Sequence, residues 1–395
     1  MIEFIGVLAT FALIFILALK RVNLGLVLLL ASTILGVTSY VSPQGFLKVA
    51  YLTFTDYTTY ELILSVGFIS ILGNCLKETG FMVDMIESLR GFLSSKWLVA
   101  LIPALFGLLP MPGGALMSAP FNEGEADRLK MSAEEKTYVN VWFRHFWFFA
   151  SPISSTTILI SRLVGVNLYT FLLTTFPISF LLALVGYFFS IRRFKNASES
   201  HHSPSLSALV KGLLPILLTI ILNILGVLLP VAILVGISLI LVLGRMGLRK
   251  SASAVWHGVH WDILSALIGV IFFRYMINES GSVTLIFSRL KDAGVPVLVL
   301  VTIFPFLIGF TSGTPQSGIG IGVPLVLPLF SSLSLHVVAI LYLSIVVGYM
   351  MSPLHLCFVL TNAYYKSDLA KVYRTLVPSL LVLYAAGLFY LLLRL

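Results

Sequence analysis

Two adjacent ionisable residues lie inside one of the most apolar stretches of the chain. Arg144 and His145 occur within "VWFRHFWFF". A charge deep in a bilayer is costly and usually marks a pathway for substrate or ions. An arginine near a helix end can instead extend its side chain to the membrane surface, and both interpretations remain open. If the pair faces the interior, Arg144 suits anion binding and His145 suits substrate binding. His145 or His355 could also carry a proton.

Hydroxyl side chains follow this pair at a predicted helix break, "FASPISSTT" at 149–157, which corresponds to "MMSPLHLCF" at 350–358. A proline inside a helix frees backbone carbonyls, and carbonyls with hydroxyls can hold a small cation. The alternative is that these hydroxyls only satisfy backbone groups beside a kink. We predict substrate binding by Ser154, Ser155, His355 and Asn362, and Na⁺ coordination by Ser151, Thr156 and Ser352.

Two further stretches combine proline and glycine, "GLLPMPGGALMSAP" at 107–120 and "GFTSGTPQSGIGIGVP" at 309–324. Proline costs a helix interior about 3 kcal/mol and glycine about 1 kcal/mol. We interpret both as tips of re-entrant hairpins, although a packing kink is the simpler alternative. Half-helix N-termini at such tips attract anions. The predicted substrate contacts are Pro112, Gly113, Gly114, Thr314, Pro315, Gln316 and Ser317, and the predicted Na⁺ contacts are Ser312 and Gly313.

The breaks recur because the chain contains an internal repeat. A shift of about 200 residues aligns Ser151-Pro152 with Ser352-Pro353, and Pro177 with Pro378. Apolar residues would coincide by chance in such a composition, whereas prolines and glycines would not. We therefore expect each hairpin tip to face the broken helix of its own repeat, near the middle of the membrane.

Composition places the chain in a membrane, since 58% of its 395 residues are hydrophobic and 10% are charged. If both hairpins return to the side they came from, most Lys and Arg residues lie on one side, as the positive-inside rule requires. If both stretches cross, the basic residues divide equally. The first arrangement gives ten spans, two inverted repeats and both termini outside. The predicted regions are a first repeat at 1–195 with a cytoplasmic-side hairpin at 97–120, a cytoplasmic linker at 196–211, and a second repeat at 212–395 with an outside hairpin at 295–325.

Several other functions find less support. The formal charge of +9 resides mainly at predicted span ends, so it predicts membrane orientation and no nucleic-acid partner. P-loop, HExxH and GxSxG motifs are absent from the sequence. No carboxylate is predicted in mid-span, although Glu61, Glu78 and Asp262 are marginal, so a carboxylate proton relay is not supported. Cys75 and Cys357 are expected to be small packing residues.

The motif "LPMPGGALMSAP", the segment "RHFWFFASP" and the chain length resemble the DUF401 family of prokaryotic membrane proteins. The resemblance implies membership of the wider ion-transporter superfamily, which includes gluconate permeases, citrate transporters and divalent-anion/Na⁺ symporters. It also implies re-entrant hairpins, elevator-type alternating access, frequent dimers and organic-anion substrates. The Ser-Asn-Thr signature of the dicarboxylate symporters is absent here. Neither the substrate nor the coupling ion can therefore be transferred.

The sequence thus predicts an all-α membrane protein with two inverted repeats, each of five transmembrane helices plus one re-entrant hairpin. The predicted function is secondary active transport of a small organic anion, a carboxylate, coupled to Na⁺ or H⁺. A homodimer in a prokaryotic plasma membrane is expected, with no cofactor besides Na⁺ and no enzymatic activity. A passive anion channel is the main alternative, and an intramembrane hydrolase using Ser154 or Ser155 with His145 is a more remote one.

Overall fold

The structure is a computed structural model that describes residues 2–20, 22–108, 114–195, 205–282, 289, 293–330 and 333–395. Within these residues every regular element is a helix, and no strand occurs. The first half contains α1 (Ile2–Leu19), α2 (Leu24–Thr38), α3 (Pro43–Thr55), α4 (Tyr57–Glu78), α5 (Phe81–Phe92), α6 (Ser95–Gly107), α7 (Gly114–Arg128), α8 (Ala133–Arg144), η1 (His145–Phe149), α9 (Ser155–Val164), α10 (Leu168–Phe189) and η2 (Ile191–Arg193). The second half contains α11 (Leu206–Ile224), α12 (Leu229–Leu243), α13 (Leu248–His257), α14 (Trp261–Ser280), α16 (Val297–Ser312), α17 (Pro315–Val326), η3 (Leu327–Leu329), α18 (Leu335–Met351), α19 (Leu356–Tyr365) and α20 (Leu369–Leu392).

Polar residues set where many of these helices begin. The side chain of Ser132 accepts from the backbone N–H of Glu135, whose carboxylate in turn accepts from the Ser132 N–H, so a capping box starts α8. The side chain of Asn167 accepts hydrogen bonds from the first amides of α10, and that of Asp368 accepts them from the first amides of α20. These caps satisfy helix-end amides that lipid cannot satisfy.

Six helical stretches of the described chain are long and apolar enough to cross a membrane. They are Tyr57–Glu78, Leu168–Phe189, Leu206–Ile224, Trp261–Ser280, Leu335–Tyr365 and Leu369–Leu392. These stretches identify a membrane protein. Residues 206–211, at the end of the predicted linker, are part of α11.

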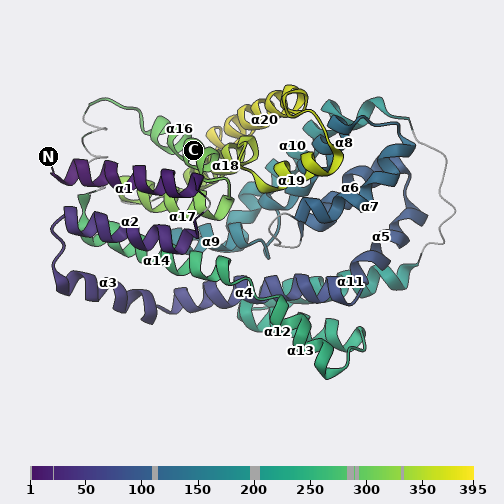
Figure 1. The fold of residues 1–395 in the computed structure, drawn as a ribbon, viewed down its shortest axis with the longest axis horizontal. Helices are drawn as coiled ribbons and strands as arrows, with labels where there is room; N and C mark the ends of the chain where they lie inside the picture. The colour runs from purple at the N-terminus through teal and green to yellow at the C-terminus, as the bar shows by residue number, and fades with distance from the viewer. Residues whose placement is uncertain are drawn as a thin grey trace.

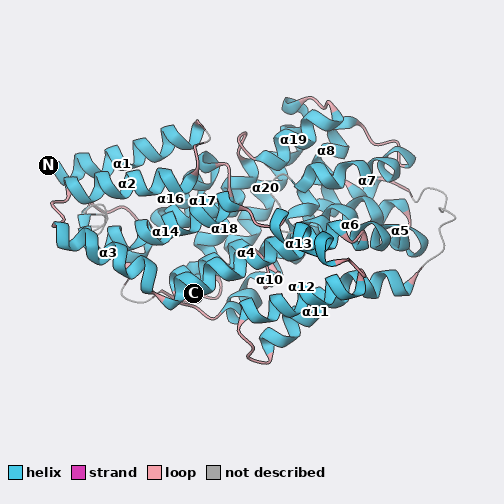
Figure 2. Cartoon of the chain, turned by 60° about the horizontal axis from the view of Figure 1, so that its bottom comes forward, coloured by secondary structure: helices cyan, strands magenta, loops and turns pink. Residues whose placement is uncertain are grey.

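The two halves of the chain interleave. Figure 1 shows α1 to α3 at the same end of the elongated molecule as α16 and α17, whereas α6 and α7 lie at the other end with α11. Figure 2 keeps the same separation after rotation. Extensive packing joins α2 to α14, α12 to α4 and α5 to α11, so each end of the molecule contains helices from both halves.

Each helical hairpin packs against both halves of the chain. The arms α6 and α7 pack on each other, as do α16 and α17. Each first arm contacts the helix before the break in its own half, since α6 packs on α8 and α16 packs on α18. Each second arm also contacts the helix after the break in the other half, since α7 packs on α19 and α17 packs on α9. The hairpins therefore join the two breaks.

Close glycine contacts hold the first arms against the broken helices. A Cβ added to Gly107 would lie 2.1 Å from the carbonyl oxygen of Arg144, and one added to Gly309 would lie 2.2 Å from that of Ile345. Only a residue without a side chain allows α6 and α16 to approach these backbones so closely. The two contacts occupy corresponding positions in the internal repeat.

Candidate functional site

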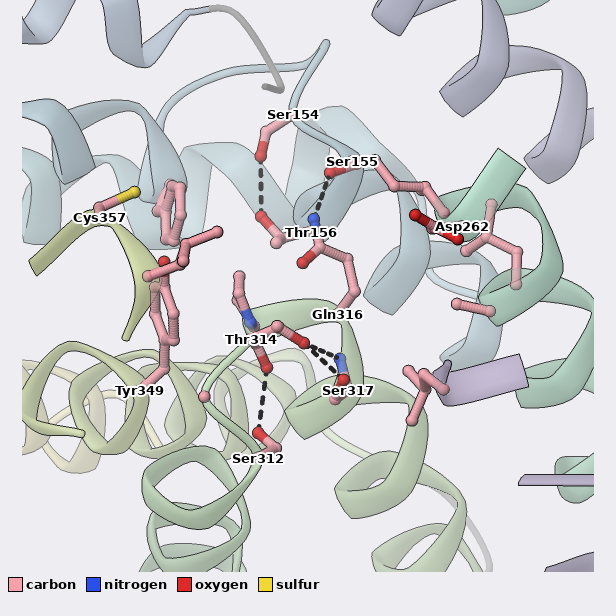
Figure 3. A pocket seen from close by; sticks show the side chains of 18 of the residues that line it. Ser154, Ser155, Thr156, Asp262, Ser312, Thr314, Gln316, Ser317, Tyr349 and Cys357 are labelled. Atoms are coloured by element: carbon pink, nitrogen blue, oxygen red, sulfur yellow. Dashed lines mark hydrogen bonds between the residues drawn. The ribbon is translucent and has the colours of Figure 1, made fainter. Parts of the chain in front are cut away.

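A cavity of about 590 Å³ lies where the second hairpin meets both breaks. Its volume is typical of a site for a small molecule. Residues from α2 and α14 form a mainly apolar wall, and hydroxyl and amide side chains gather opposite (Figure 3). Eleven of the predicted site residues line it: Arg144, His145, Ser154, Ser155, Thr156, Ser312, Gly313, Thr314, Pro315, Gln316 and Ser317.

Three half-helices begin at the cavity wall, and a fourth begins beside it. Residues of the first turns of α9, α17 and α19 line the cavity, and α7 begins at Gly114 against the guanidinium of Arg144. The N-caps of α9 and α19 provide no side-chain hydrogen bond to the first amides. Each helix N-terminus carries roughly half a positive charge. This arrangement favours a negatively charged ligand in the cavity.

Arg144 adds a full positive charge to these partial charges. It is the last residue of α8 and is 6% exposed, so its side chain lies inside the protein and not along a lipid-facing surface. Its Nη1 donates to the carbonyl oxygen of Phe106 at 2.7 Å, near the end of α6. A Cβ on Gly114 would lie 2.2 Å from Nη2. Arg144 therefore occupies the gap between the two arms of the first hairpin.

Hydrogen bonds join the tip of the second hairpin to the break of the first half. Gln316 Nε2 donates to Ser155 Oγ at 2.9 Å (Figure 3). Beside this bond, the hydroxyls of Ser154 and Thr156 lie 2.8 Å apart, and Thr156 also bonds to Tyr342 at 2.8 Å. The internal repeat predicts that each tip faces the break of its own repeat. That expectation is incomplete, because α17 packs on α9 across the two halves.

The second tip also approaches its own break. Gly313 has φ +65°, which favours glycine, and a Cβ there would lie 2.8 Å from Leu354 Cβ. The hydroxyls of Thr314 and Ser317 bond to each other, and Ser312 Oγ donates to the Thr314 carbonyl at 3.0 Å. The tip is therefore a polar turn placed between two unwound segments.

The other predicted site residues that the structure describes do not line the cavity. Ser151 and Ser352 cap their own breaks, where each hydroxyl accepts from the amide two residues ahead. Asn362 Oδ1 accepts from Ser367 at 2.6 Å, at the far end of α19. His355 is fully buried behind the wall, and Gly114 lies against Arg144. Pro112, Gly113 and the rest of the first tip lie outside the described residues.

Four cavity residues with polar side chains were not predicted as site residues. Asn23 Nδ2 donates to Asp262 Oδ1 at 3.3 Å, and both line the cavity opposite the hairpin tip. Tyr349 and Cys357 line the wall beside His145. Cys357 borders the cavity and is 6% exposed, whereas Cys75 is fully buried within α4. Two features of the sequence could have indicated these residues. Asp262 lies at a predicted span end, and Cys357 comes just after a predicted break.

The family described as "Protein of unknown function (DUF401)" matches residues 4–393. The chain belongs to this family. No curated protein matches the chain. Among solved structures, it is similar to the crystal structure of the YdaH transporter from Alcanivorax borkumensis, which is described as having an unusual topology. The two chains are 16% identical with a TM-score of 0.62, over 89% of this chain and 88% of that chain. The fold is therefore similar to that of the YdaH transporter.

Proposed function

We propose that this protein is a secondary active transporter of a small organic anion, a carboxylate, coupled to Na⁺ or H⁺. The observation that carries the proposal is the convergence of half-helix N-termini and Arg144 on one cavity. The transporter-like fold supports the same class of function.

A carboxylate fits the charge and shape of this cavity. Uncapped amides of α9 and α19 can donate hydrogen bonds to an oxyanion, and Arg144 supplies the compensating charge. The apolar side chains of α2 and α14 can contact the carbon skeleton of the substrate. Because the apolar wall and the polar wall come from different elements, a rigid-body movement of one against the other would open the site.

Coupling to Na⁺ is supported by the oxygen atoms around the second tip. Ser312 and Thr314 contribute hydroxyl and carbonyl oxygens there, and Ser154 and Thr156 contribute hydroxyls across the cavity. Hard cations prefer oxygen ligands. H⁺ coupling would use His145, which borders the same cavity.

The repeated packing supports an inverted-repeat transporter that moves by an elevator-type mechanism. The hairpins and broken helices would form the moving unit. The first helices of each half, α1 with α2 and α11 with α12, would form the fixed scaffold and the homodimer contact. The protein would operate in a prokaryotic plasma membrane with both termini outside.

Each alternative function lacks a specific supporting contact. A hydrolase would need a base beside its nucleophile. Within the described residues, however, Ser155 pairs with Gln316, Ser154 pairs with Thr156, and Nδ1 of His145 faces the Val141 carbonyl. A passive channel would share the cavity, and is distinguished by its inability to concentrate an anion against a gradient.

The test is thermal unfolding of the detergent-purified protein with a panel of carboxylates, in NaCl and in KCl. A ligand at 100 times its Kd stabilises the folded state by about 2.7 kcal/mol. We expect at least one carboxylate to raise the melting temperature, more strongly in NaCl if Na⁺ is coupled. Arg144→Gln should remove this increase, and Arg249→Gln, at an exposed position of α13, should retain it.

The stabilising carboxylate is then tested for uptake into proteoliposomes with imposed Na⁺ and H⁺ gradients. Accumulation that depends on a gradient supports secondary transport, and equilibration alone identifies a channel. If no carboxylate changes the melting temperature in either salt, the proposed substrate class is wrong.

A further inference from the structure

Three side chains with nitrogen and sulfur donors meet beside the cavity. His145 begins η1, His355 is the N-cap of α19, and Cys357 lies in the first turn of α19. One donor atom from each residue lies within 4.8 Å of the other two. The three residues are 1%, 0% and 6% exposed, so water competes little with a ligand at this cluster.

The orientation of His145 leaves its second ring nitrogen to the Cys357 side chain, with which it interacts. Its Nδ1 lies 2.6 Å from the carbonyl oxygen of Val141. A carbonyl can only accept a hydrogen bond, so Nδ1 carries the proton and Nε2 keeps its lone pair. Metal-binding histidines are commonly held in this way, with the second ring nitrogen donating to a backbone carbonyl.

His355 is unusual because neither ring nitrogen has a hydrogen-bond partner among the described residues, although the side chain is completely buried. The Met350 backbone interacts with the ring but does not reach hydrogen-bond geometry. The ring also packs on Tyr349, with centroids 4.1 Å apart. An unsatisfied buried polar group costs about 1–3 kcal/mol, and a bound ligand would remove that cost.

The spacing suits tetrahedral coordination. Bonds of about 2.0–2.1 Å to nitrogen and 2.3 Å to sulfur place two nitrogens and one sulfur of a tetrahedral site roughly 3.3–3.6 Å apart. Because the donor atoms lie within 4.8 Å of one another, each pair needs to approach by at most about 1–1.5 Å to reach these separations. Two imidazoles and a thiolate suit Zn²⁺ better than Na⁺, Mg²⁺ or Ca²⁺, which prefer oxygen.

We propose that His145, His355 and Cys357 form a binding site for Zn²⁺ or a chemically similar divalent transition-metal ion. His145 and Cys357 line the cavity, so a fourth ligand would reach the metal from the cavity side. Metal binding deprotonates the thiol, and the resulting thiolate offsets part of the repulsion from the nearby Arg144. The site joins the end of α8 to the start of α19 and does not depend on the proposed transport function.

The probe is Co²⁺, added to the chelator-treated full-length protein in detergent. Cobalt bound to a thiolate gives a ligand-to-metal charge-transfer absorption that cobalt bound to histidine alone does not give. The chain contains two cysteines, so the signal can be assigned to one thiol. We expect the band in wild type and in Cys75→Ser, and its loss in Cys357→Ser. His355→Gln should weaken Co²⁺ binding at least about tenfold, and Zn²⁺ should displace the Co²⁺.

A second measurement uses the wild-type protein, in case a variant fails to fold. Zn²⁺ should slow maleimide labelling of Cys357 at least about tenfold, as measured by peptide mass spectrometry after digestion. It should leave the labelling rate of Cys75 unchanged. Absence of a thiolate band in wild type, persistence of the band in folded Cys357→Ser, or unprotected labelling of Cys357 would each overturn the proposal.

Discussion

Replacing Gly107 by alanine tests whether the first hairpin is held against α8 by direct backbone contact. The added Cβ would lie 2.1 Å from the carbonyl oxygen of Arg144 and 3.0 Å from the carbonyl carbon. Ordinary contact begins near 3.4 Å, so α6 and α8 must separate by about 1.3 Å. The obstacle is backbone, which cannot move aside as a flexible side chain can.

The expected size of the effect follows from two opposing terms. Overpacking of this kind costs about 1–3 kcal/mol, whereas glycine-to-alanine exchange in a helix contributes about 0.5–1 kcal/mol in the stabilising direction. We expect a net loss of about 1–2 kcal/mol. The entropy of unfolding is about 2.1 cal/mol/K per residue. Over 395 residues, the expected loss of stability therefore lowers the melting temperature by about 1–2 °C. Helix that remains in the unfolded state in detergent lowers the entropy of unfolding, so the same loss of free energy shifts the melting temperature further.

Gly124→Ala is the matched control on the same hairpin. Gly124 lies in α7, is exposed, and a Cβ there would meet nothing within 4 Å. The substitution then adds only the higher helix propensity of alanine, so the variant should be as stable as wild type or slightly more stable. The assay is thermal unfolding of both variants in the same detergent. If Gly107→Ala is at least as stable as Gly124→Ala, the close backbone contact between α6 and α8 does not hold the hairpin.

Three further predictions concern polar groups around the hairpins. Glu125→Gln should lower the free energy of unfolding by about 3 kcal/mol, measured by denaturant titration, because this 1% exposed carboxylate pairs with Arg90 at 3.1 Å; an unchanged midpoint would contradict it. A double-mutant cycle of Gln316→Ala with Ser155→Ala should give a coupling of about 0.5–1.5 kcal/mol, and a coupling near zero would mean that the 2.9 Å bond does not join tip and break. Tyr342→Phe should cost about 1–3 kcal/mol in thermal unfolding, since its buried hydroxyl has two partners, and no loss would refute this.

Local features of the sequence determined the helices and their interruptions. The break at Ser151-Pro152 and its counterpart at Ser352-Pro353 are present, as is the second tip around Gly313. These follow from proline, glycine and capping chemistry within a few residues. Hydropathy over about 20 residues likewise identified a membrane protein, because lipid excludes unsatisfied polar groups wherever a segment crosses.

Only the tertiary structure decided which interruptions meet. The Gln316 side chain reaches Ser155 in the other half, and Cys357 lies beside His145, although each pair is far apart in sequence. Residue type cannot specify such contacts, because the same hydroxyl can cap its own helix, as Ser151 does, or face a cavity, as Ser155 does. The choice depends on how α17 packs against α9 and α7 against α19. That packing arises from side-chain shape across the whole fold.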